Sequence, residues 1–330
     1  MAERTSATQV VQIGLESTPG TAVAANRQLP SLQLTTGIAA NFTEILPTGY
    51  KFPTAMAPGK EWTTASFNAA SIGYDEIIYL LFSVASYAAG VQQSSTTAYK
   101  YTLGPSTSAD DTIKTVTVEQ GSSVRAHKFA YGLVTDLTIK GDRDKVELSG
   151  NMIGNALSDG ITMTSSPTVI AQVPILAKDV SIYADDTAAG LGTTKLTRVL
   201  SWEYTIASRF SPLWVVDAAN SSYVAHTETP IQASLKLMLE ADSTGNALFT
   251  TTARAGSTKF FRVQATSSTL AGTAIPYSMK LDIGGQVKSQ PDQFQDSDGV
   301  YAYGLTFSAV HDPTWLKGVA FEVINKRATA

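Results

Sequence analysis

The stretch IQASLKLMLE, residues 231–240, alternates apolar and polar side chains. Successive side chains of a β-strand point to opposite faces, so Leu235, Leu237 and Leu239 predict a strand with one buried face. Pro230 precedes this strand. The pattern is typical of a sheet that packs on a core with one side only, and it sets the expectation for the rest of the chain.

The residues after this strand predict a short helix and further strands. Asp242 or Ser243 suits the N-cap of the helix, and Gly256 suits its C-terminal stop. Closing strands are expected over 260–264, 277–288 and 300–310, with a polar turn over 292–299 between the last two.

The first half of the chain repeats this order of elements. Pro58 precedes an expected strand over 61–70, and residues 74–87 predict a helix. One face of that helix carries Ile77, Ile78, Leu81, Phe82 and Ala85. Further strands are expected over 98–103, 113–119, 128–140 and 145–153, and, past a polar stretch over 155–167, over 173–183 and 195–206.

The matched order predicts a duplication. The quartets Leu32-Gln33-Leu34-Thr35 and Trp202-Glu203-Tyr204-Thr205 open the two repeats with the same apolar-polar-apolar-Thr pattern. We therefore expect an N-terminal arm over 1–30, a first β unit over 31–170, and a second β unit with a C-terminal tail over 171–330.

Two segments are expected to lack regular structure throughout. Residues 7–29 hold glycines and a proline among small side chains, which indicates a loop or an extended arm. Residues 35–60 contain six glycines and prolines and are interpreted as a long loop. Long loops in compact domains are often functional or ordered by a partner, which favours a role in assembly.

Composition favours a mainly β protein without tight nucleic-acid binding. Of 330 residues, 43% are hydrophobic and 16% are charged, and Ser, Thr, Val and Tyr are abundant. The net charge of −4 and the absence of a basic stripe exclude a surface that neutralises many phosphates. The absence of cysteine excludes disulfides, thiolate metal sites and a cysteine nucleophile.

No segment predicts export or membrane insertion. Residues 1–12 lack an apolar signal region, so synthesis in the cytoplasm is expected. The most apolar stretch, 77–89, is about half the roughly 20 residues that a membrane-spanning helix needs.

Catalytic, cofactor and metal sites are not expected. His127, His226 and His311 lack the spacing of a metal site, and no GxSxG motif supplies a nucleophile. GLGTTK, residues 190–195, lacks the spacing of a phosphate loop, and DSDG, residues 296–299, lacks the other ligands of a calcium loop. Both are interpreted as turns, and the chain is predicted not to be an enzyme.

The opening VQIGLESTPGTAVAA, residues 11–25, resembles the start of many tail tube proteins of long-tailed bacteriophages of the siphophage type. Those N-termini commonly read Gly, one residue, Glu and then a TxGTA-like turn, which here are Gly14, Glu16 and Pro19-Gly20-Thr21-Ala22. AKDVSIYAD, residues 177–185, is similar to a second segment of that family. The resemblance covers roughly residues 12–310.

The resemblance implies two tandem β-sandwich tail-tube units, each with one flanking α-helix, that complete a β-barrel on oligomerisation. Single-unit members form hexameric rings, so a two-unit chain implies trimeric rings that act as pseudo-hexamers, with hexameric rings as the alternative. Stacked rings would form the conduit for DNA ejection. Viral DNA would pass through the lumen without tight binding, because a mildly acidic protein repels phosphates.

The resemblance also implies location and partners. The protein would reside in the virion tail, bind copies of itself, and meet other tail proteins such as the tape measure and the tail terminator. Contacts between subunits or stacked rings are expected in the arm and the long loop, at Gly14, Glu16, Pro19, Gly20, Thr43, Pro47, Tyr50, Phe52 and Pro53. Strand parity does not fix which face of the sheet lines the lumen.

Two other classes compete with this interpretation. Aromatic residues in the strands, such as Trp62 and Trp214, are expected to pack in the core, but they also suit a carbohydrate-binding or adhesin-like β-sandwich module. A hydrolase with two β domains would need acids that converge on a cleft, and the sequence shows no such spacing.

Overall fold

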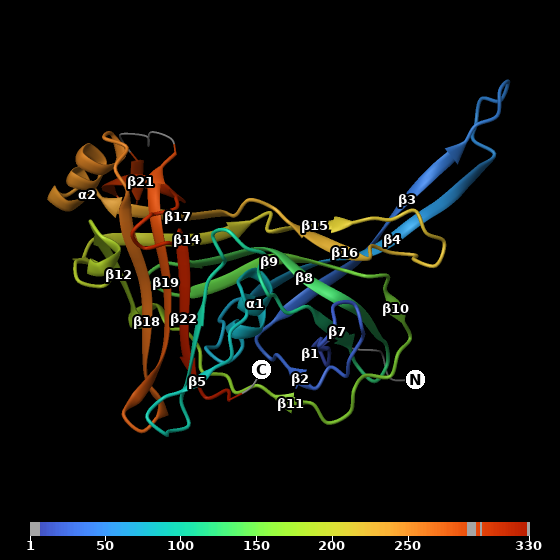
Figure 1. Ribbon diagram of the computed structural model, residues 1–330, viewed down its shortest axis with the longest axis horizontal. Coiled ribbons are helices and arrows are strands. Elements are labelled where there is room, and N and C mark those ends of the chain that lie inside the picture. Colours follow the sequence, from blue (N-terminus) through green and yellow to red (C-terminus); the bar gives the residue numbers. More distant parts are fainter. Residues whose placement is uncertain (1–6, 289–294, 298, 329–330) are drawn as a thin grey trace.

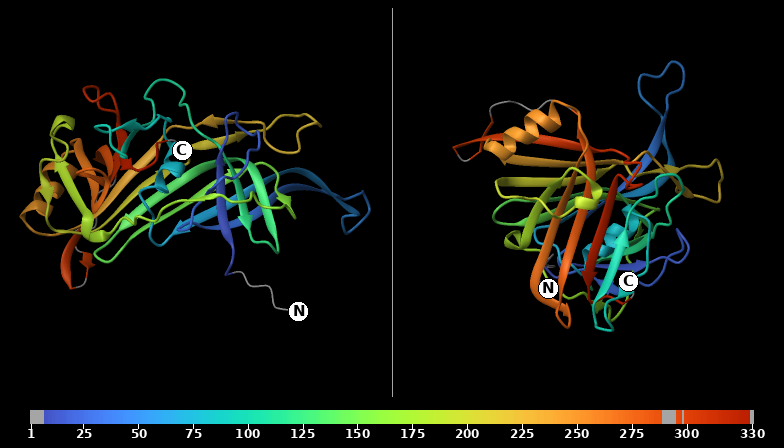
Figure 2. Two further views of the ribbon diagram at one scale, coloured as in Figure 1. Left: turned by 90° about the horizontal axis from the view of Figure 1, so that it is seen from below. Right: turned by 60° about the vertical axis from the view of Figure 1, so that its left-hand side comes forward.

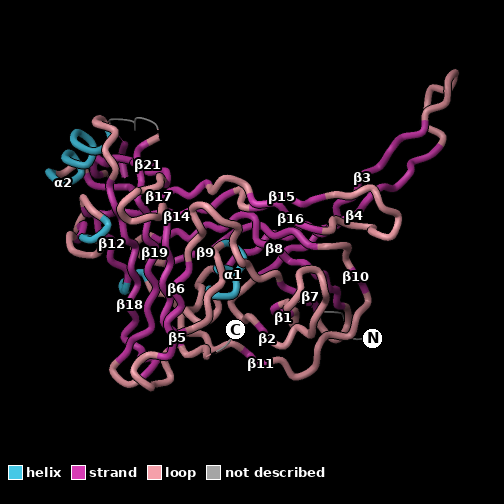
Figure 3. The backbone as a smooth tube through the Cα atoms, in the orientation of Figure 1, coloured by secondary structure: helices cyan, strands magenta, loops and turns pink. Residues whose placement is uncertain are grey.

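The computed structural model describes residues 7–288, 295–297 and 299–328, and strands predominate in it (Figures 1 and 3). The predicted mainly β class is therefore confirmed. The short helices are α1 (Ile77–Val84), α2 (Ser243–Ala247), the π-helical turn η3 (Leu248–Ala253), and the 3-10 turns η1 (Ala177–Asp179) and η2 (Ala188–Gly190). No described helix is long and apolar enough to cross a membrane.

One antiparallel sheet runs the length of the molecule, and we call it the long sheet (Figure 2). Its strands, in order of pairing, are β3 (Gln33–Ile45), β4 (Ala55–Ala69), β9 (Val146–Gly154), β8 (Ala126–Gly141), β14 (Val199–Ala207), β17 (Gln232–Glu240) and β21 (Val300–Ala309). The end of β19 (Ile275–Val287) and β20 (Gln295–Ser297) pair with the far side of β21.

Two further groups of strands complete the fold. At one end β7 (Val116–Gly121) joins the first part of β8 to β1 (Val10–Leu15), followed by β2 (Arg27–Gln28) and β11 (Thr168–Val169), while β10 (Ser158–Asp159) pairs with β8. At the other end the order is β13 (Lys195–Leu196), β12 (Val180–Asp185), β18 (Lys259–Gly272), β19, β22 (Val319–Asn325), β6 (Tyr99–Leu103) and β5 (Val91–Gln92). A separate hairpin joins β15 (Phe210–Leu213) to β16 (Ala225–Glu228).

The hydrophobic core is continuous from one end of the molecule to the other. The alternation in residues 231–240 forms β17, and Leu235, Leu237 and Leu239 are buried. The expected helix over 74–87 is α1, but all eight of its residues are buried, so it lies inside the fold and does not flank it. Ser83 of α1 accepts a hydrogen bond from the Val134 backbone N–H of β8 at 3.0 Å, which ties the helix to the long sheet.

Two sequence-based expectations were wrong. The segment expected as an arm forms β1 and β2, with Val11, Ile13 and Leu29 in the core. The expected loop over 35–60 is mostly the β3–β4 hairpin. Pro47, Gly49 and Pro53 lie in the 46–54 connection, Pro58 and Gly59 lie at the register shift near Ala40, and Gly37 pairs regularly with Thr64 inside β3. Near the C-terminus, a strand that the sequence did not predict, β22, covers Val319–Asn325.

Two polar segments near the C-terminus form turns or strands. Asp312 accepts the backbone N–H groups of Thr314 and Trp315 at 3.0 and 2.6 Å, so a turn follows His311. Of the polar turn expected over 292–299, residues 292–294 and 298 lie outside the described residues, and 295–297 form β20.

Candidate functional site

The long sheet has one covered and one uncovered face. On β4, Thr63, Ala65 and Phe67 are buried, whereas Thr64 and Ser66 are exposed. The same alternation continues through the neighbouring strands, because antiparallel register keeps directly paired residues on one face. The core therefore lies on one side of the long sheet, and the other side carries polar side chains.

A single row of uncharged polar residues crosses the uncovered face, and we call it the polar row. Direct strand pairs connect its members in the order Gln33, Asn68, Ser149, Thr138, Thr205, Ser234, Ser308 and Gln286. All are exposed or half-buried. The Oγ1 atoms of Thr138 and Thr205 lie 3.1 Å apart. A surface of short hydroxyl and amide groups offers no fixed charge to hold a phosphate.

The neighbouring row of the same face alternates in charge. Lys140 pairs with Glu147 on one side and with Glu203 on the other, and Glu203 pairs with Lys236. The Lys140 Nζ lies 3.1 Å from the Glu147 carboxylate. Each cation thus has an acidic neighbour, which lowers the attraction of this row for a polyanion.

Both edges of the long sheet are open among the described residues. β3 pairs with β4 alone. On the opposite edge, Gln286, Val287 and all of β20 pair with β21 alone, whereas Gly285 also pairs with Lys259 of β18. Unpaired strand edges present rows of free backbone N–H and C=O groups, which are templates for pairing with another chain.

In the middle of the long sheet, β8 and β14 join its two halves through five cross-strand pairs, from Trp202↔Gly141 to Ile206↔Leu137. Gly141 is required there, because a Cβ atom at this position would lie 2.6 Å from Nε1 of Trp202. The two threonines of the polar row meet at this junction.

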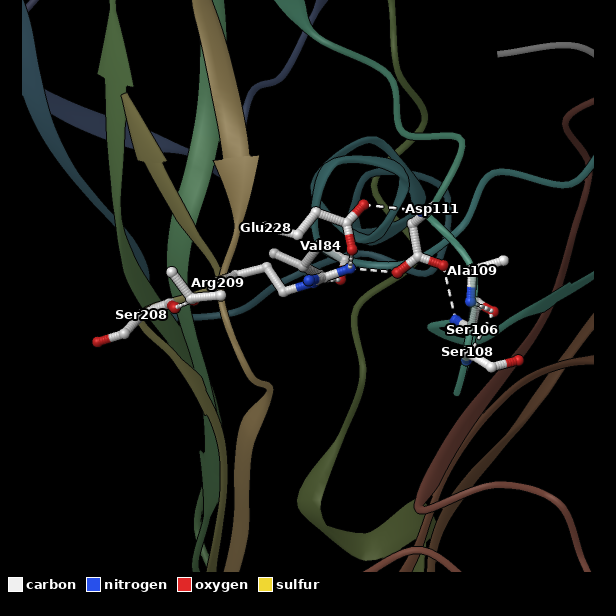
Figure 4. A network of polar contacts seen from close by, with 9 residues as sticks. Val84, Ser106, Ser108, Ala109, Asp111, Ser208, Arg209 and Glu228 are labelled. Carbon is white, nitrogen blue, oxygen red and sulfur yellow. Dashed lines mark hydrogen bonds and ion pairs between the residues drawn. The ribbon is translucent and has the colours of Figure 1, made fainter. Parts of the chain in front are cut away.

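A buried ion cluster lies beside the same junction (Figure 4). Arg209 follows β14, and its guanidinium bonds the carboxylate of Asp111 and, at 3.2 Å, that of Glu228. Its Nε donates to the Val84 carbonyl at the end of α1, also at 3.2 Å. Burial raises the pKa of Asp111, and the nearby guanidinium opposes the rise. The cluster therefore fastens the second half of the chain to the helix and loop of the first half.

The sequence motif around Glu16 is an internal anchor. Glu16 is buried, and its carboxylate accepts hydrogen bonds from the backbone N–H groups of Gly20 and Tyr131 and from two threonine hydroxyls, at 2.7–2.9 Å. Gly14 is also buried, and a side chain does not fit there, because a Cβ atom would lie 2.3 Å from the Ala24 carbonyl oxygen. Pro19 is exposed and Gly20 is half-buried with a positive φ of 80°. A contact with another subunit at this motif is available to the turn and not to the Glu16 carboxylate.

Asp185, the last residue of the AKDVSIYAD segment, is a similar internal anchor to Glu16. Its carboxylate accepts the backbone N–H groups of Gly192, Thr193 and Thr194 at 2.9–3.3 Å. These are the amides that a phosphate would need in the GLGTTK segment, so that loop is organised by its own acid.

The other predicted contact residues lie together on a projecting arm. We call residues 38–62, the part of the β3–β4 hairpin beyond its pairing with β9, the first arm (Figure 1). Tyr50 and Phe52 are 64% and 78% exposed at its tip. Thr43 and Pro53 are exposed and Pro47 is half-buried. Large exposed apolar side chains on the first arm are Ile38, Phe42, Ile45, Leu46, Tyr50, Phe52 and Met56.

Several of these features could not be found from the sequence, because they depend on which strands pair. The polar row joins residues from eight strand segments, and Arg209 meets Asp111 across 98 positions of sequence. Of the aromatic residues expected in the core, Tyr101, Tyr131, Trp202 and Tyr204 are buried, whereas Trp62 and Tyr303 are half-buried and Trp214 is 36% exposed.

Comparison with known proteins adds no assignment. No protein-family model matches this sequence, and no curated protein matches it at a significant level.

Proposed function

We propose that this chain is a structural subunit of a bacteriophage tail tube, which forms rings by joining the open edges of its long sheet. The observation that carries the proposal is the β8–β14 junction. At this junction the two halves of one chain pair edge to edge, and the proposed contact between one copy and the next has the same form.

The pairing pattern supports a duplicated chain. In the first half β1 pairs with β7, β3 with β4, β4 with β9, and β8 with β7 and β9. In the second half β12 pairs with β18, β14 with β17, β17 with β21, and β19 with β18 and β21. The helices α1 and α2 occupy corresponding places in the two series. Glu16 directly follows β1, and Asp185 is the last residue of the corresponding strand β12. Two tandem units account for all of these matches.

The correspondence gives each open edge a partner. β14 corresponds to β3, and β8 corresponds to β19 continued by β20. Since β14 pairs with β8 inside the chain, β3 of one copy would pair with the β19–β20 edge of another in the same way. The pairing is head to tail, so it repeats until a ring closes and no edge is left.

Three copies make a ring of reasonable size. Each long sheet contributes eight strand positions, and three sheets with strands about 4.8 Å apart and tilted by about 40° would close into a barrel about 50 Å across between backbones. Such a barrel leaves room for a DNA duplex. Six units in three chains correspond to the pseudo-hexameric ring that the family resemblance implies.

The uncovered face suits a conduit. In a closed ring the core and α1 lie outside the barrel wall, and the polar row faces the lumen. Uncharged hydroxyls and paired charges bind phosphates weakly, so DNA could move along this wall without being held.

Size measurement and electron microscopy of the purified protein test the proposal. Gel filtration with light scattering should give an assembly larger than the monomer, and negative-stain images should show rings or tubes with a central hole. A protein that stays monomeric under all salt and concentration conditions would refute the tube and favour the carbohydrate-binding or adhesin-like alternative, which glycan binding would then test.

A further inference from the structure

A second projecting hairpin suggests where the first arm goes. We call residues 208–229, which include β15 and β16, the second arm. It lies between β14 and β17, as the first arm lies between the paired parts of β3 and β4. The two arms are thus corresponding parts of the two proposed units, and both leave the long sheet towards the same side of the molecule (Figure 1).

The second arm is docked on its own chain. Trp214 meets Trp62 with ring centroids 5.2 Å apart, and it meets Tyr223 at 5.9 Å. Tyr223 packs on Tyr131 at 5.0 Å and donates a hydrogen bond to the Tyr131 carbonyl at 2.7 Å. The second arm therefore buries Tyr223 against the first half of the chain, and Trp214, although 36% exposed, lies against Trp62.

The docking site of the second arm includes the base of the first. The Glu61 N–H donates to the Ser221 carbonyl at 3.0 Å, and the Lys60 Nζ donates to the Asp217 carbonyl at 3.2 Å. Together with Trp62, these residues make the base of the first arm the platform on which the tip of the second arm rests.

The first arm has no comparable platform among the described residues. Along its length it carries seven large apolar side chains that are between 47% and 78% exposed. Contiguous exposed apolar surface on a soluble protein commonly marks an interaction site. The first arm extends from the edge strand β3, so the position next to it in a closed ring is occupied by the second half of an adjacent copy.

Strand correspondence locates the matching platform on that copy. Leu34 pairs with Phe67 as Tyr204 pairs with Leu235, so Phe67 corresponds to Leu235. Counting back along the two strands, residues 60–62 correspond to residues 228–230. This base of the second arm borders an open pocket of about 310 Å³, lined in part by Pro230, Ile231, Val310 and His311.

We infer that the first arm of one copy lies across the base of the second arm of the adjacent copy in the same ring, at Glu228–Ile231 and the pocket beside it. The inference rests on the proposed ring. The sequence alone was compatible with a contact between neighbouring subunits and with a contact between stacked rings. The inference selects the contact between neighbouring subunits of one ring. The second arm covers the base of the first arm within one chain, and the first arm would cover the base of the second arm of the adjacent copy.

The absence of native cysteine allows a direct cross-linking test. The double variant Phe52→Cys/His311→Cys carries one thiol on the tip of the first arm and one at the pocket, and both side chains are exposed. The assembled protein is treated with a short bis-maleimide and separated on a denaturing gel. The control Phe52→Cys/Val124→Cys moves the second thiol to an exposed residue between β7 and β8.

The expected result is a ladder of linked chains that ends at the number of copies in one ring, with little linkage in the control. Intact rings without linkage of Phe52→Cys to His311→Cys would overturn the inference and leave the proposed function standing. A ladder that continues past the number of copies in a ring would also overturn it, because the arm would then reach the next ring. Failure to form rings in the cysteine-free parent would sink both proposals.

Discussion

Removing the guanidinium of Arg209 gives the sharpest test of how the two halves are fastened together. The side chains of Arg209 and Asp111 are 1% and 0% exposed, so Arg209→Ala leaves the Asp111 carboxylate buried without its cation. It also removes a donor from the Val84 carbonyl. Removing one partner of a buried ion pair typically costs about 3–5 kcal/mol, and we expect the free energy of unfolding to fall by about this amount.

The assay is urea unfolding followed by tryptophan fluorescence, with Arg125→Ala as the matched control. Arg125 bonds Asp159 at 2.9 Å, but both side chains are more than half exposed, so its removal should have no measurable effect. Because Arg209 opposes the burial that raises the pKa of Asp111, the variant should raise that pKa further. With a raised carboxyl pKa, the folded variant takes up a proton at a higher pH than the folded parent does. The loss of unfolding free energy relative to the parent should therefore shrink as the pH falls from about 7 towards about 4.

The reasoning would be refuted by a loss in Arg209→Ala as small as that in Arg125→Ala, or by a deficit that grows on acidification. Either result would mean that Asp111 is not a buried carboxylate that depends on Arg209 for its charge partner.

Three other predictions concern the motif, the first arm and the uncovered face. Glu16→Ala leaves four donors without their buried acceptor, and urea unfolding should show a loss of about 3 kcal/mol, whereas Glu44→Ala on the exposed arm should match the parent. Replacing residues 43–57 by an Asn-Gly turn should leave a monomer with the circular dichroism spectrum of a folded β protein, and electron micrographs should show no tubes. Normal tubes would contradict this prediction. Ser234 belongs to the polar row, and Thr306 pairs with Lys236 on the same face. Ser234→Lys and Thr306→Lys should change stability by no more than about 0.5 kcal/mol but give assembled rings a salt-dependent affinity for DNA, while Thr227→Lys on the second arm should not.

Local pattern predicted the elements whose burial is decided by their own side chains. The alternation of leucines in residues 231–240 gives β17, and the apolar face over 74–87 gives α1. In each, the apolar side chains recur at the spacing of a strand or a helix often enough to identify the element without knowing which other segments it packs against.

Elements that depend on distant partners were missed. β1 is short and was obscured by the glycine and prolines around it, yet it gains a full set of hydrogen bonds from β7, about a hundred positions away. β6 was expected in the first unit, but it pairs with β22 near the C-terminus. The polar row was invisible for the same reason: each of its residues is an ordinary strand Ser, Thr, Asn or Gln until the register of eight strand segments aligns them.

The central claim is that copies of this chain close into rings whose inner wall is the uncovered face of the long sheet. A cryo-electron microscopy reconstruction of the assembled protein tests it most directly. The account predicts three copies in each ring, β3 of one copy paired with the β19–β20 edge of the next, and the polar row with Thr138 and Thr205 facing the lumen. A ring whose lumen is lined by another surface, or an assembly in which β3 remains unpaired, would contradict it.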